Sequence, residues 1–254
     1  MTKKNVRETK NIAYSYGYLV ESDENSKLCK LLNYSYTTDL VDDLDNICAN
    51  VAGVIAINYW NKLYGNNLLN LSYEEVDDKL NMDTDTAKAY IRKFYKYMNT
   101  NWILGQWGGA LPWNVYGGFE NFIKDINKGF KTKRTELSNY SEIKSFISKN
   151  VPVFIVSDDY YFTYYPEMTL PNVSVVKGNN MVTFDYSHTW GLVNAHSFVG
   201  FGYAEYDLYD SNGNCNKLEF VRVADGWYYS RYFNVKLSRM LSAAAIEVIE
   251  LSGC

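Results

Sequence analysis

The chain carries a cysteine and a histidine in surroundings that suit a catalytic pair. Cys48 opens an apolar run that ends at Trp60, and His196 precedes a run of alternating apolar residues and glycines. Unpaired N–H groups and the dipole at a helix N-terminus stabilise a thiolate, and a nearby imidazole can accept the thiol proton. Taken singly, Cys48 is more simply explained as a small core residue and His196 as a strand-end residue. Taken together, they indicate a thiolate nucleophile.

Asp225 is the residue expected to complete the site. The segment Leu218–Trp227 reads as a second strand that ends at Asp225, where a glycine turns the chain. If this strand lies beside the strand of His196, the Asp225 carboxylate accepts one ring N–H of the imidazole and leaves the other nitrogen facing Cys48. The alternative for Asp225 is a turn aspartate before glycine. His188, the other histidine, lies in a segment of weaker strand character and is expected away from the thiol.

The helix that must position Cys48 follows from hydrophobic periodicity. Apolar residues recur at helical spacing after Cys48, at Ala52, Ile55, Ala56, Tyr59 and Leu63. Further apolar residues leave little polar face, so a central, buried helix is expected, with Asp45 or Asn46 as its N-cap.

The rest of the chain predicts helices before strands. Helices are expected over Thr84–Met98, over Phe119–Ile126 and over Ser141–Ser148. A loop at Gly105–Pro112 and the segment Tyr116–Gly118 precede the second of these helices. Strands are expected after Pro152, with the last at Ala245–Leu251, and at Ile12–Val20 after a polar arm to about residue 10. No linker divides the chain. We therefore expect one α+β domain over residues 1–254, with a helical part at about 40–150 and an antiparallel β part at about 151–254.

These motifs resemble the active-site segments of bacterial papain-like cysteine peptidases. Cys48–Trp60 resembles their Cys-x-Pro-Thr-Ala helix ending in Tyr-Trp, and Ala195–Tyr203 resembles their Gly-His-x-x-Val-x-Gly-Tyr strand. Val223–Trp227 resembles their Val-x-Asp-Gly-Trp segment, and Tyr140–Val156 resembles a helix followed by a Pro-Val-Phe-Ile-Val strand. The likeness is nearest to the C39-like peptidases, more distant to streptopain-type enzymes, and extends over roughly residues 40–251.

The resemblance implies a papain-like fold, in which the nucleophile helix of an N-terminal helical lobe packs on a C-terminal antiparallel sheet. It implies Cys48, His196 and Asp225 as the catalytic residues of a cysteine peptidase, which hydrolyses a peptide or amide bond through an acyl-enzyme. Two alternatives stay open. One is a catalytically impaired binding or interaction module, and the other is an acyltransferase that uses the same three residues with an amine as acceptor.

The chain departs from the family pattern at the oxyanion-stabilising position. Six residues before the cysteine, where papain-like enzymes keep a glutamine, this chain has Asp42. An ionised carboxylate cannot donate a hydrogen bond and repels a developing oxyanion. Asn46 and Asn50 are the alternative donors. Smaller departures are Asn50-Val-Ala in place of Pro-Thr-Ala, and Ala195 in place of the glycine before the histidine.

The partner that the resemblance implies is a peptide or protein substrate, and composition argues against two other kinds of partner. A net charge of −4 and a pI near 5.3 argue against nucleic acid, and no apolar stretch has the length of a membrane span. Four cysteines in a chain of this length do not indicate a disulfide scaffold. The spacing of His188, His196, Asp210 and Cys215 matches no common zinc pattern, so neither a metal nor a cofactor is expected. A signal-peptide pattern is not recognisable, which leaves a cytoplasmic protein or a secreted one whose signal peptide has been removed.

Overall fold

Four α-helices form in the described part of the chain, where apolar residues recur every three or four positions. The structure is a computed structural model that describes residues 6–13, 19–21, 38–65, 67–69, 74–76, 79–81, 83–102, 109–163, 174–176, 181–190, 195–209, 215–224, 226 and 232–251. The helices are α1 (Cys48–Leu63), α2 (Thr84–Tyr97), α3 (Pro112–Ile126) and α4 (Tyr140–Ser148), and a short 3₁₀ helix, η1, spans Thr38–Leu40. Helices α1, α2 and α4 lie where the sequence predicts them.

Local signals set the starts of three helices. At the start of α2, Asp83 Oδ1 accepts a hydrogen bond from the Thr86 N–H at 2.9 Å. At the start of α4, Asn139 Oδ1 accepts one from the Glu142 N–H at 3.0 Å. Such caps satisfy N–H groups that have no partner within the helix. Helix α3 begins instead with Pro112, whose missing N–H costs nothing at this position.

Eleven of the described strands form one antiparallel sheet. The strands of the chain are β1 (Val6–Ala13), β2 (Leu19–Glu21), β3 (Glu74–Val76), β4 (Lys79–Asn81), β5 (Phe130–Leu137), β6 (Val153–Ser157), β7 (Asp159–Thr163), β8 (Ser174–Val176), β9 (Met181–Trp190), β10 (His196–Tyr209), β11 (Cys215–Ala224), β12 (Tyr232–Arg239) and β13 (Ser242–Glu250). The sheet order is β1-β9-β7-β12-β11-β10-β6-β13-β5, with β2 also paired to β10 and β8 to β9. Strands β3 and β4 form a separate ribbon.

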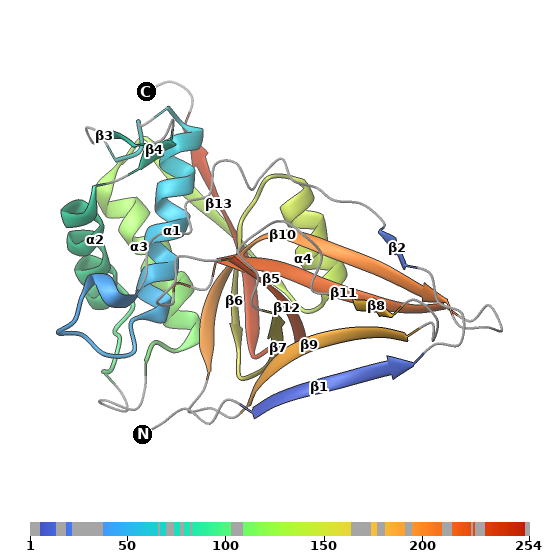
Figure 1. Cartoon of the computed structure of the whole chain (residues 1–254). Coiled ribbons are helices and arrows are strands. Elements are labelled where there is room, and N and C mark those ends of the chain that lie inside the picture. Colours follow the sequence, from blue (N-terminus) through green and yellow to red (C-terminus); the bar gives the residue numbers. More distant parts are fainter. Residues whose placement is uncertain are drawn as a thin grey trace.

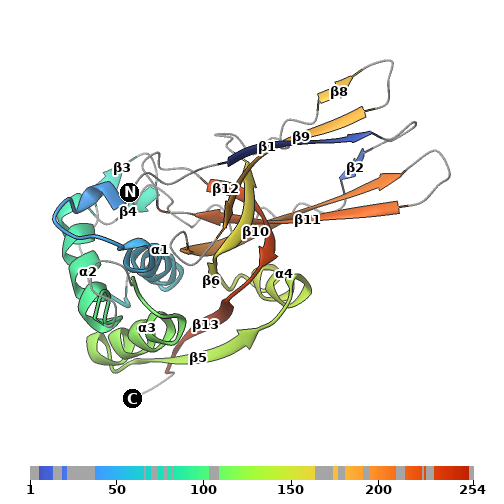
Figure 2. The same ribbon diagram turned by 90° about the horizontal axis from the view of Figure 1, so that it is seen from below.

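The chain is therefore α+β, as the sequence predicts. Helices α1, α2 and α3 lie together on one side, and the sheet curves away from them on the other (Figure 1). Helix α1 lies between α2 and the sheet, and it packs against α2, α3 and β10 (Figure 2). Because these elements surround α1, all of its residues from 49 to 61 are buried. The expectation of a central, buried helix is confirmed.

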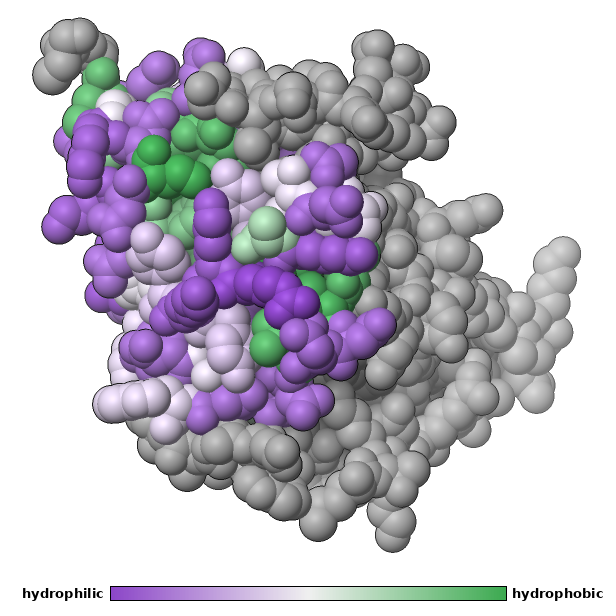
Figure 3. All heavy atoms as spheres, turned by 90° about the vertical axis from the view of Figure 1, so that its left-hand side faces the viewer, coloured by the Kyte–Doolittle hydropathy of each residue, from purple (hydrophilic) through white to green (hydrophobic). Residues whose placement is uncertain are grey.

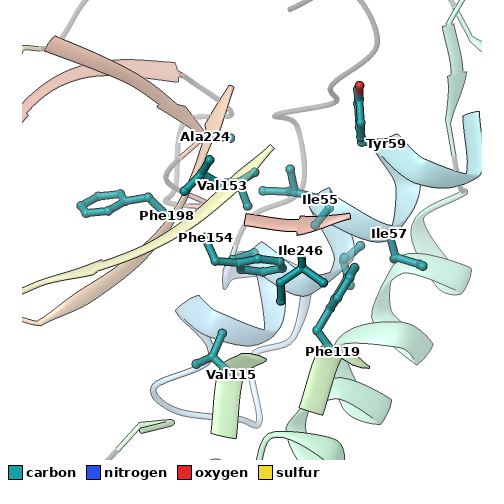
Figure 4. Packing of buried hydrophobic residues seen from close by; sticks show 14 of the residues in the cluster. Ile55, Ile57, Tyr59, Val115, Phe119, Val153, Phe154, Phe198, Ala224 and Ile246 are labelled. Atoms are coloured by element: carbon teal, nitrogen blue, oxygen red, sulfur yellow. The ribbon is translucent and has the colours of Figure 1, made fainter. Parts of the chain in front are cut away.

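Aliphatic and aromatic side chains fill the space between α1, α3 and the sheet (Figure 4). Phe119 of α3 packs edge-on against Phe154 of β6, with ring centroids 5.1 Å apart. Ile55 of α1 points toward Val153 of β6 (Figure 4). Full burial of one such side chain contributes about 1.5–3 kcal/mol to folding. These contacts between α1, α3 and the sheet therefore hold α1 in a defined position.

The predicted start of α3 is wrong. The sequence places Gly117 and Gly118 before the helix, but α3 begins at Pro112 and runs through both glycines. The reason is a close approach between helices. A Cβ atom at position 118 would lie 2.7 Å from the Tyr97 carbonyl oxygen and 2.9 Å from Met98 Cα. Glycine is present here because the end of α2 touches α3, and not because the chain turns.

The division into a helical part at 40–150 and a β part at 151–254 is also too simple. Strand β5, at Phe130–Leu137, lies within the segment predicted as helical and pairs with β13 near the other end of the chain. The predicted strand at Ile12–Val20 is instead two strands, β1 and β2, and β1 begins within the predicted polar arm. Both belong to the main sheet, because β1 pairs with β9 and β2 with β10.

The surface on the helical side is mostly hydrophilic. Seen from the left-hand side of Figure 1, the described residues show broad polar areas interrupted by small apolar patches (Figure 3).

Candidate active site

Cys48 is the first residue of α1, as predicted. The N-cap is Ile47, with φ −89° and ψ 13°, and its side chain makes no capping hydrogen bond. The first α-helical backbone bond joins the Val51 N–H to the Ile47 carbonyl at 3.0 Å. The N–H groups before Val51 therefore have no acceptor within the helix. Together with the helix dipole they favour negative charge at the Cys48 end.

The prediction that Asp45 or Asn46 caps α1 is wrong, because both are held by Asn101. Asn46 has φ 58°, and its Nδ2 donates to Asn101 Oδ1 at 3.1 Å. Asn101 Nδ2 donates in turn to the Asp45 carbonyl at 3.1 Å and to Tyr95 Oη at 3.2 Å. Asn101 Oδ1 also accepts a bond from the Gly109 N–H at 3.1 Å. Asn101, which follows α2, thus fixes the turn that leads into Cys48.

Cys48 belongs to the face of α1 that looks toward the sheet. Ala52, Ile55 and Tyr59 follow it at spacings of four, seven and eleven residues, which places all four on one stripe of an α-helix. Ile55 points toward β6 (Figure 4), and Tyr59 Oη donates to the carbonyl of Asn150, just before β6, at 2.7 Å. The thiol, which is partly exposed, therefore lies on the stripe of α1 that packs on the sheet.

The register of the strands shows which end of the sheet Cys48 approaches. Tyr59, near the end of α1, donates to a carbonyl before β6, and Tyr64, the residue after α1, donates to a carbonyl late in β13. The start of β6 pairs with Gly200 in β10, whereas its last residue, Ser157, pairs with His196. Since the C-terminal half of α1 lies near the start of β6, its N-terminal half extends toward the end of β6. That is the end at which β10 begins with His196.

A backbone hydrogen bond supports this direction independently. The Thr38 N–H, at the start of η1 and ten residues before Cys48, donates to the Gly226 carbonyl at 2.8 Å. Gly226 follows β11, whose last residue, Ala224, pairs with Val199 in β10. The segment that leads into α1 is therefore fastened to the end of the sheet where β10 begins and β11 ends.

His196 is the first residue of β10 and is 3 % exposed. Its ring meets the Phe198 ring edge-on, with centroids 4.8 Å apart and an angle of 78° between the planes. Strand pairing to Ser157 fixes its backbone. A buried imidazole held on two sides has few rotamers, which suits a base that must keep one orientation.

Asp225 lies outside the described residues. Its two neighbours in sequence are described, since Ala224 ends β11 and Gly226 accepts the bond from Thr38. The sequence argument required that the strand before Asp225 lie beside the strand of His196. This condition is met, because β10 and β11 pair as an antiparallel hairpin from Val199 and Ala224 outward.

The three oxyanion candidates occupy different surroundings. Asn50 is fully buried, and its Nδ2 donates to Thr100 Oγ1 at 2.9 Å and lies 3.5 Å from Met98 Sδ, on the α2 side of α1. Asn46 is exposed and donates to Asn101. Asp42 is exposed on the turn that follows η1. Asn50 would have to leave Thr100 to serve an oxyanion, and each alternative donor already has a partner.

Acidic side chains gather before Cys48, and one of them is neutralised. Asp43 accepts two hydrogen bonds from the Arg92 guanidinium of α2, at 2.9 and 2.6 Å. These bonds hold the pKa of the Asp43 carboxyl below its ordinary value and raise the pKa of Arg92. Asp42 and Asp45 are exposed on the same segment. The segment that leads into Cys48 thus carries exposed carboxylates, of which Asp43 is paired with Arg92.

The other histidine, the other cysteines and Asp210 lie away from the first residue of β10 or outside the described residues. His188 lies in β9, where its backbone pairs with Val6 and Tyr161. In the sheet order, β7, β12 and β11 separate β9 from β10. Cys29 and Cys254 lie outside the described residues, as does Asp210. The backbone of Cys215 pairs with Tyr209 at the far end of the β10–β11 hairpin from His196.

Comparison of the chain with protein-family models, with curated proteins and with solved structures finds no match. Among the described residues, no three His, Cys, Asp or Glu side chains are grouped to hold a metal ion. Within that same part of the chain, each helix is too short or too polar to cross a membrane. The functional argument therefore rests on the geometry around Cys48 and His196.

Proposed function

We propose that the chain is a cysteine hydrolase with a papain-like arrangement, which cleaves a peptide or amide bond. Cys48 is the nucleophile, His196 is the base, and Asp225 orients the imidazole. One observation carries the proposal: the stripe of α1 that bears Cys48 packs on the sheet, at the end where β10 begins with the buried His196. The uncapped first turn of α1 adds a reason for the thiol to ionise.

The chemistry that this arrangement supports is acyl transfer. His196 accepts the thiol proton, and the Cys48 thiolate attacks the carbonyl carbon of the substrate. His196 then protonates the leaving amine as the tetrahedral intermediate collapses to a thioester. A water molecule, deprotonated by His196, hydrolyses the thioester and restores the thiol. Asp225 keeps one ring nitrogen protonated, so that the other faces the sulfur throughout the cycle.

The backbone supplies the first oxyanion donor. Since Ile47 provides no side-chain cap, the N–H of Cys48 itself is suited to stabilise the negative oxygen of the intermediate. In place of the glutamine of papain-like enzymes the chain has the exposed Asp42, which accepts but does not donate. Asn46, exposed and one residue before the N-cap, is the side-chain donor that needs the least rearrangement.

The decisive experiment measures alkylation of Cys48 by iodoacetamide as a function of pH, with the modified residue mapped by mass spectrometry. A thiolate paired with His196 is expected to give a midpoint below that of an ordinary thiol, which ionises near pH 8.5. The His196→Ala variant should move the midpoint up toward that of an ordinary thiol. The alkylation rate should fall less than the thiolate fraction does, because a less acidic thiol is intrinsically more nucleophilic. The midpoint is therefore the better readout.

Two control variants accompany this measurement. His188→Ala removes the other histidine, in a strand that three strands separate from β10, and should leave the midpoint unchanged. Cys48→Ala should abolish the fast labelling. If fast labelling instead maps to another cysteine, or if His188→Ala moves the midpoint and His196→Ala does not, the assignment of the site is wrong.

A second candidate function is supported by Asp42 and the acidic segment around it. A papain-like scaffold that binds a partner without turnover needs neither an oxyanion donor nor an ionised thiol. It predicts an alkylation midpoint near that of a free thiol in the unmodified protein. If the midpoint is low but a peptide substrate yields an amide with an added amine in place of an acid, the enzyme is an acyltransferase.

A further inference from the structure

We propose that Asn101 is a positioning residue for the Cys48 thiol. This inference rests on the function proposed above and adds a residue that the three catalytic positions do not include. Asn101 lies after the end of α2, far from Cys48 in sequence, yet its carboxamide bonds to both residues of the turn that precedes the N-cap Ile47.

Both polar atoms of the Asn101 carboxamide make hydrogen bonds. Its Nδ2 donates to the Asp45 carbonyl at 3.1 Å, and its Oδ1 accepts from Asn46 Nδ2 at 3.1 Å. The same Oδ1 accepts from the Gly109 N–H at 3.1 Å, while the Asn101 N–H donates to the Gly109 carbonyl at 2.8 Å. Asn101 therefore locks two segments together, the turn before Cys48 and the segment that leads into α3.

Left-handed backbone conformations concentrate at this junction. Asn46, Asn99, Asn101 and Gly109 have φ of 58°, 49°, 62° and 52°. Non-glycine residues adopt such angles at a cost, which persists only where surrounding bonds determine the conformation, and such residues cluster at functional sites. Two of these four residues, Asn46 and Gly109, are hydrogen-bonded to Asn101. Its removal is expected to release the turn that sets the direction of the first N–H groups of α1.

That direction matters for the thiol. The field at a helix N-terminus acts over about one turn, so it depends on how the chain enters the helix at Ile47 and Cys48. The N-cap residue itself contributes no side-chain bond. With the internal cap missing, the Asn101 bonds to Asp45 and Asn46 are side-chain contacts that hold the entry in place. The carboxamide thus acts on Cys48 indirectly, through the conformation of the turn at Asp45 and Asn46.

The test uses Asn101→Gly, because glycine accepts φ near 60° without strain and the variant removes the side chain that carries the carboxamide. The matched control is Asn127→Gly. Asn127 has the same bonding pattern at the other end of α1, where its Nδ2 donates to the Asn67 and Leu68 carbonyls at 3.1 and 3.2 Å and its Oδ1 accepts from the Gly129 N–H at 2.9 Å. The length of α1 separates the two clamps by about 24 Å.

The readout is again the pH midpoint of Cys48 alkylation, measured together with the melting temperature. Asn101→Gly should raise the midpoint by up to about 0.7 pH unit, which follows from the size of helix-terminus effects on charge. Asn127→Gly should lower the melting temperature comparably and leave the midpoint in place. Should Asn101→Gly fail to fold, Asn101→Asp keeps the acceptor and the side-chain shape, and should raise the midpoint because it loses the bond to Asp45 and adds negative charge near the thiolate.

The outcomes separate the two proposals. A low midpoint in the unmodified protein that neither Asn101 variant moves would overturn the role of Asn101 and leave the hydrolase proposal standing. A midpoint that both the Asn101 and the Asn127 variants raise equally would also overturn it, since the effect would then be general loosening of α1. A midpoint near pH 8.5 in the unmodified protein would overturn the hydrolase proposal itself.

Discussion

Two adjacent glycines in α3 should respond to alanine in opposite directions. At Gly118, a Cβ atom would lie 2.7 Å from both Met98 Cγ and the Tyr97 carbonyl oxygen, whereas at Gly117 it would meet no atom within 4 Å. Alanine in place of glycine within a helix stabilises it by about 0.5–1 kcal/mol. At Gly118 this gain is outweighed by overpacking, which costs about 1–3 kcal/mol. The neighbouring atoms belong partly to backbone, so a change of side-chain rotamer cannot remove the clash.

Gly117→Ala should therefore gain up to about 1 kcal/mol, and Gly118→Ala should lose about 1–2 kcal/mol after the two effects are combined. In a chain of this length the difference between the variants corresponds to roughly 5–10 °C in melting temperature. Urea unfolding followed by far-ultraviolet circular dichroism measures both against the unmodified protein, with the slope used to check that the denatured state is unchanged. Equal effects of the two substitutions, or a neutral Gly118→Ala, would refute the close approach of α2 and α3 from which the difference is derived.

Two further predictions concern buried polar groups, one in α1 and one packed against it. Burial raises the pKa of Tyr59, so the folded state keeps this proton at a pH where the unfolded chain loses it; stability should be complete below about pH 10 and fall above it by up to about 1.4 kcal/mol per pH unit. Tyr59→Phe should lose about 1 kcal/mol at pH 7 with its hydrogen bond and show a shallower decline in alkaline urea titrations; an unchanged alkaline slope would contradict this cause. Thr100→Val should cost about 1–3 kcal/mol, because the buried Asn50 amide loses its oxygen partner, while Thr100→Ser keeps the hydroxyl and should cost clearly less. Similar losses in both Thr100 variants would show that packing, and not the hydroxyl, is responsible.

The elements that the sequence predicts well are those whose own periodicity suffices. Helix α1 is apolar on nearly every side, and the strands β10 and β11 alternate and flank a turn-rich segment, so each can be recognised without knowing its neighbours. Strand β5 could not be recognised in this way. Only Phe130 and Leu137, at its two ends, are buried, and the charged residues between them are typical of an edge strand. Its pairing with β13 appears only when the sheet is assembled.

The residues of the candidate site also differ in whether local sequence patterns reveal them. Cys48 and His196 are recognisable because each opens a regular element, and the neighbouring position of β11 follows from the hairpin. Asn101 was missed because its bonds to Asp45 and Asn46 join residues more than fifty positions apart. A local signal was nevertheless present. Asparagine just after a helix is typical of left-handed conformation, and Asn99 and Asn101 both follow α2.

The position of β13 in the sheet has a consequence for synthesis of the chain. Although it follows every other strand in sequence, β13 lies inside the sheet between β6 and β5. Its first residue, Ser242, comes 85 positions after the end of β6 at Ser157. At elongation rates of about 5–20 residues per second, the edge of β6 that β13 will occupy therefore stays unpaired for roughly 4 to 17 s on the ribosome, and β5, which ends earlier at Leu137, waits longer for the same partner. Exposed strand edges recruit other chains, so this interval, and not the folded state, is when the protein is most open to aggregation and to capture by chaperones.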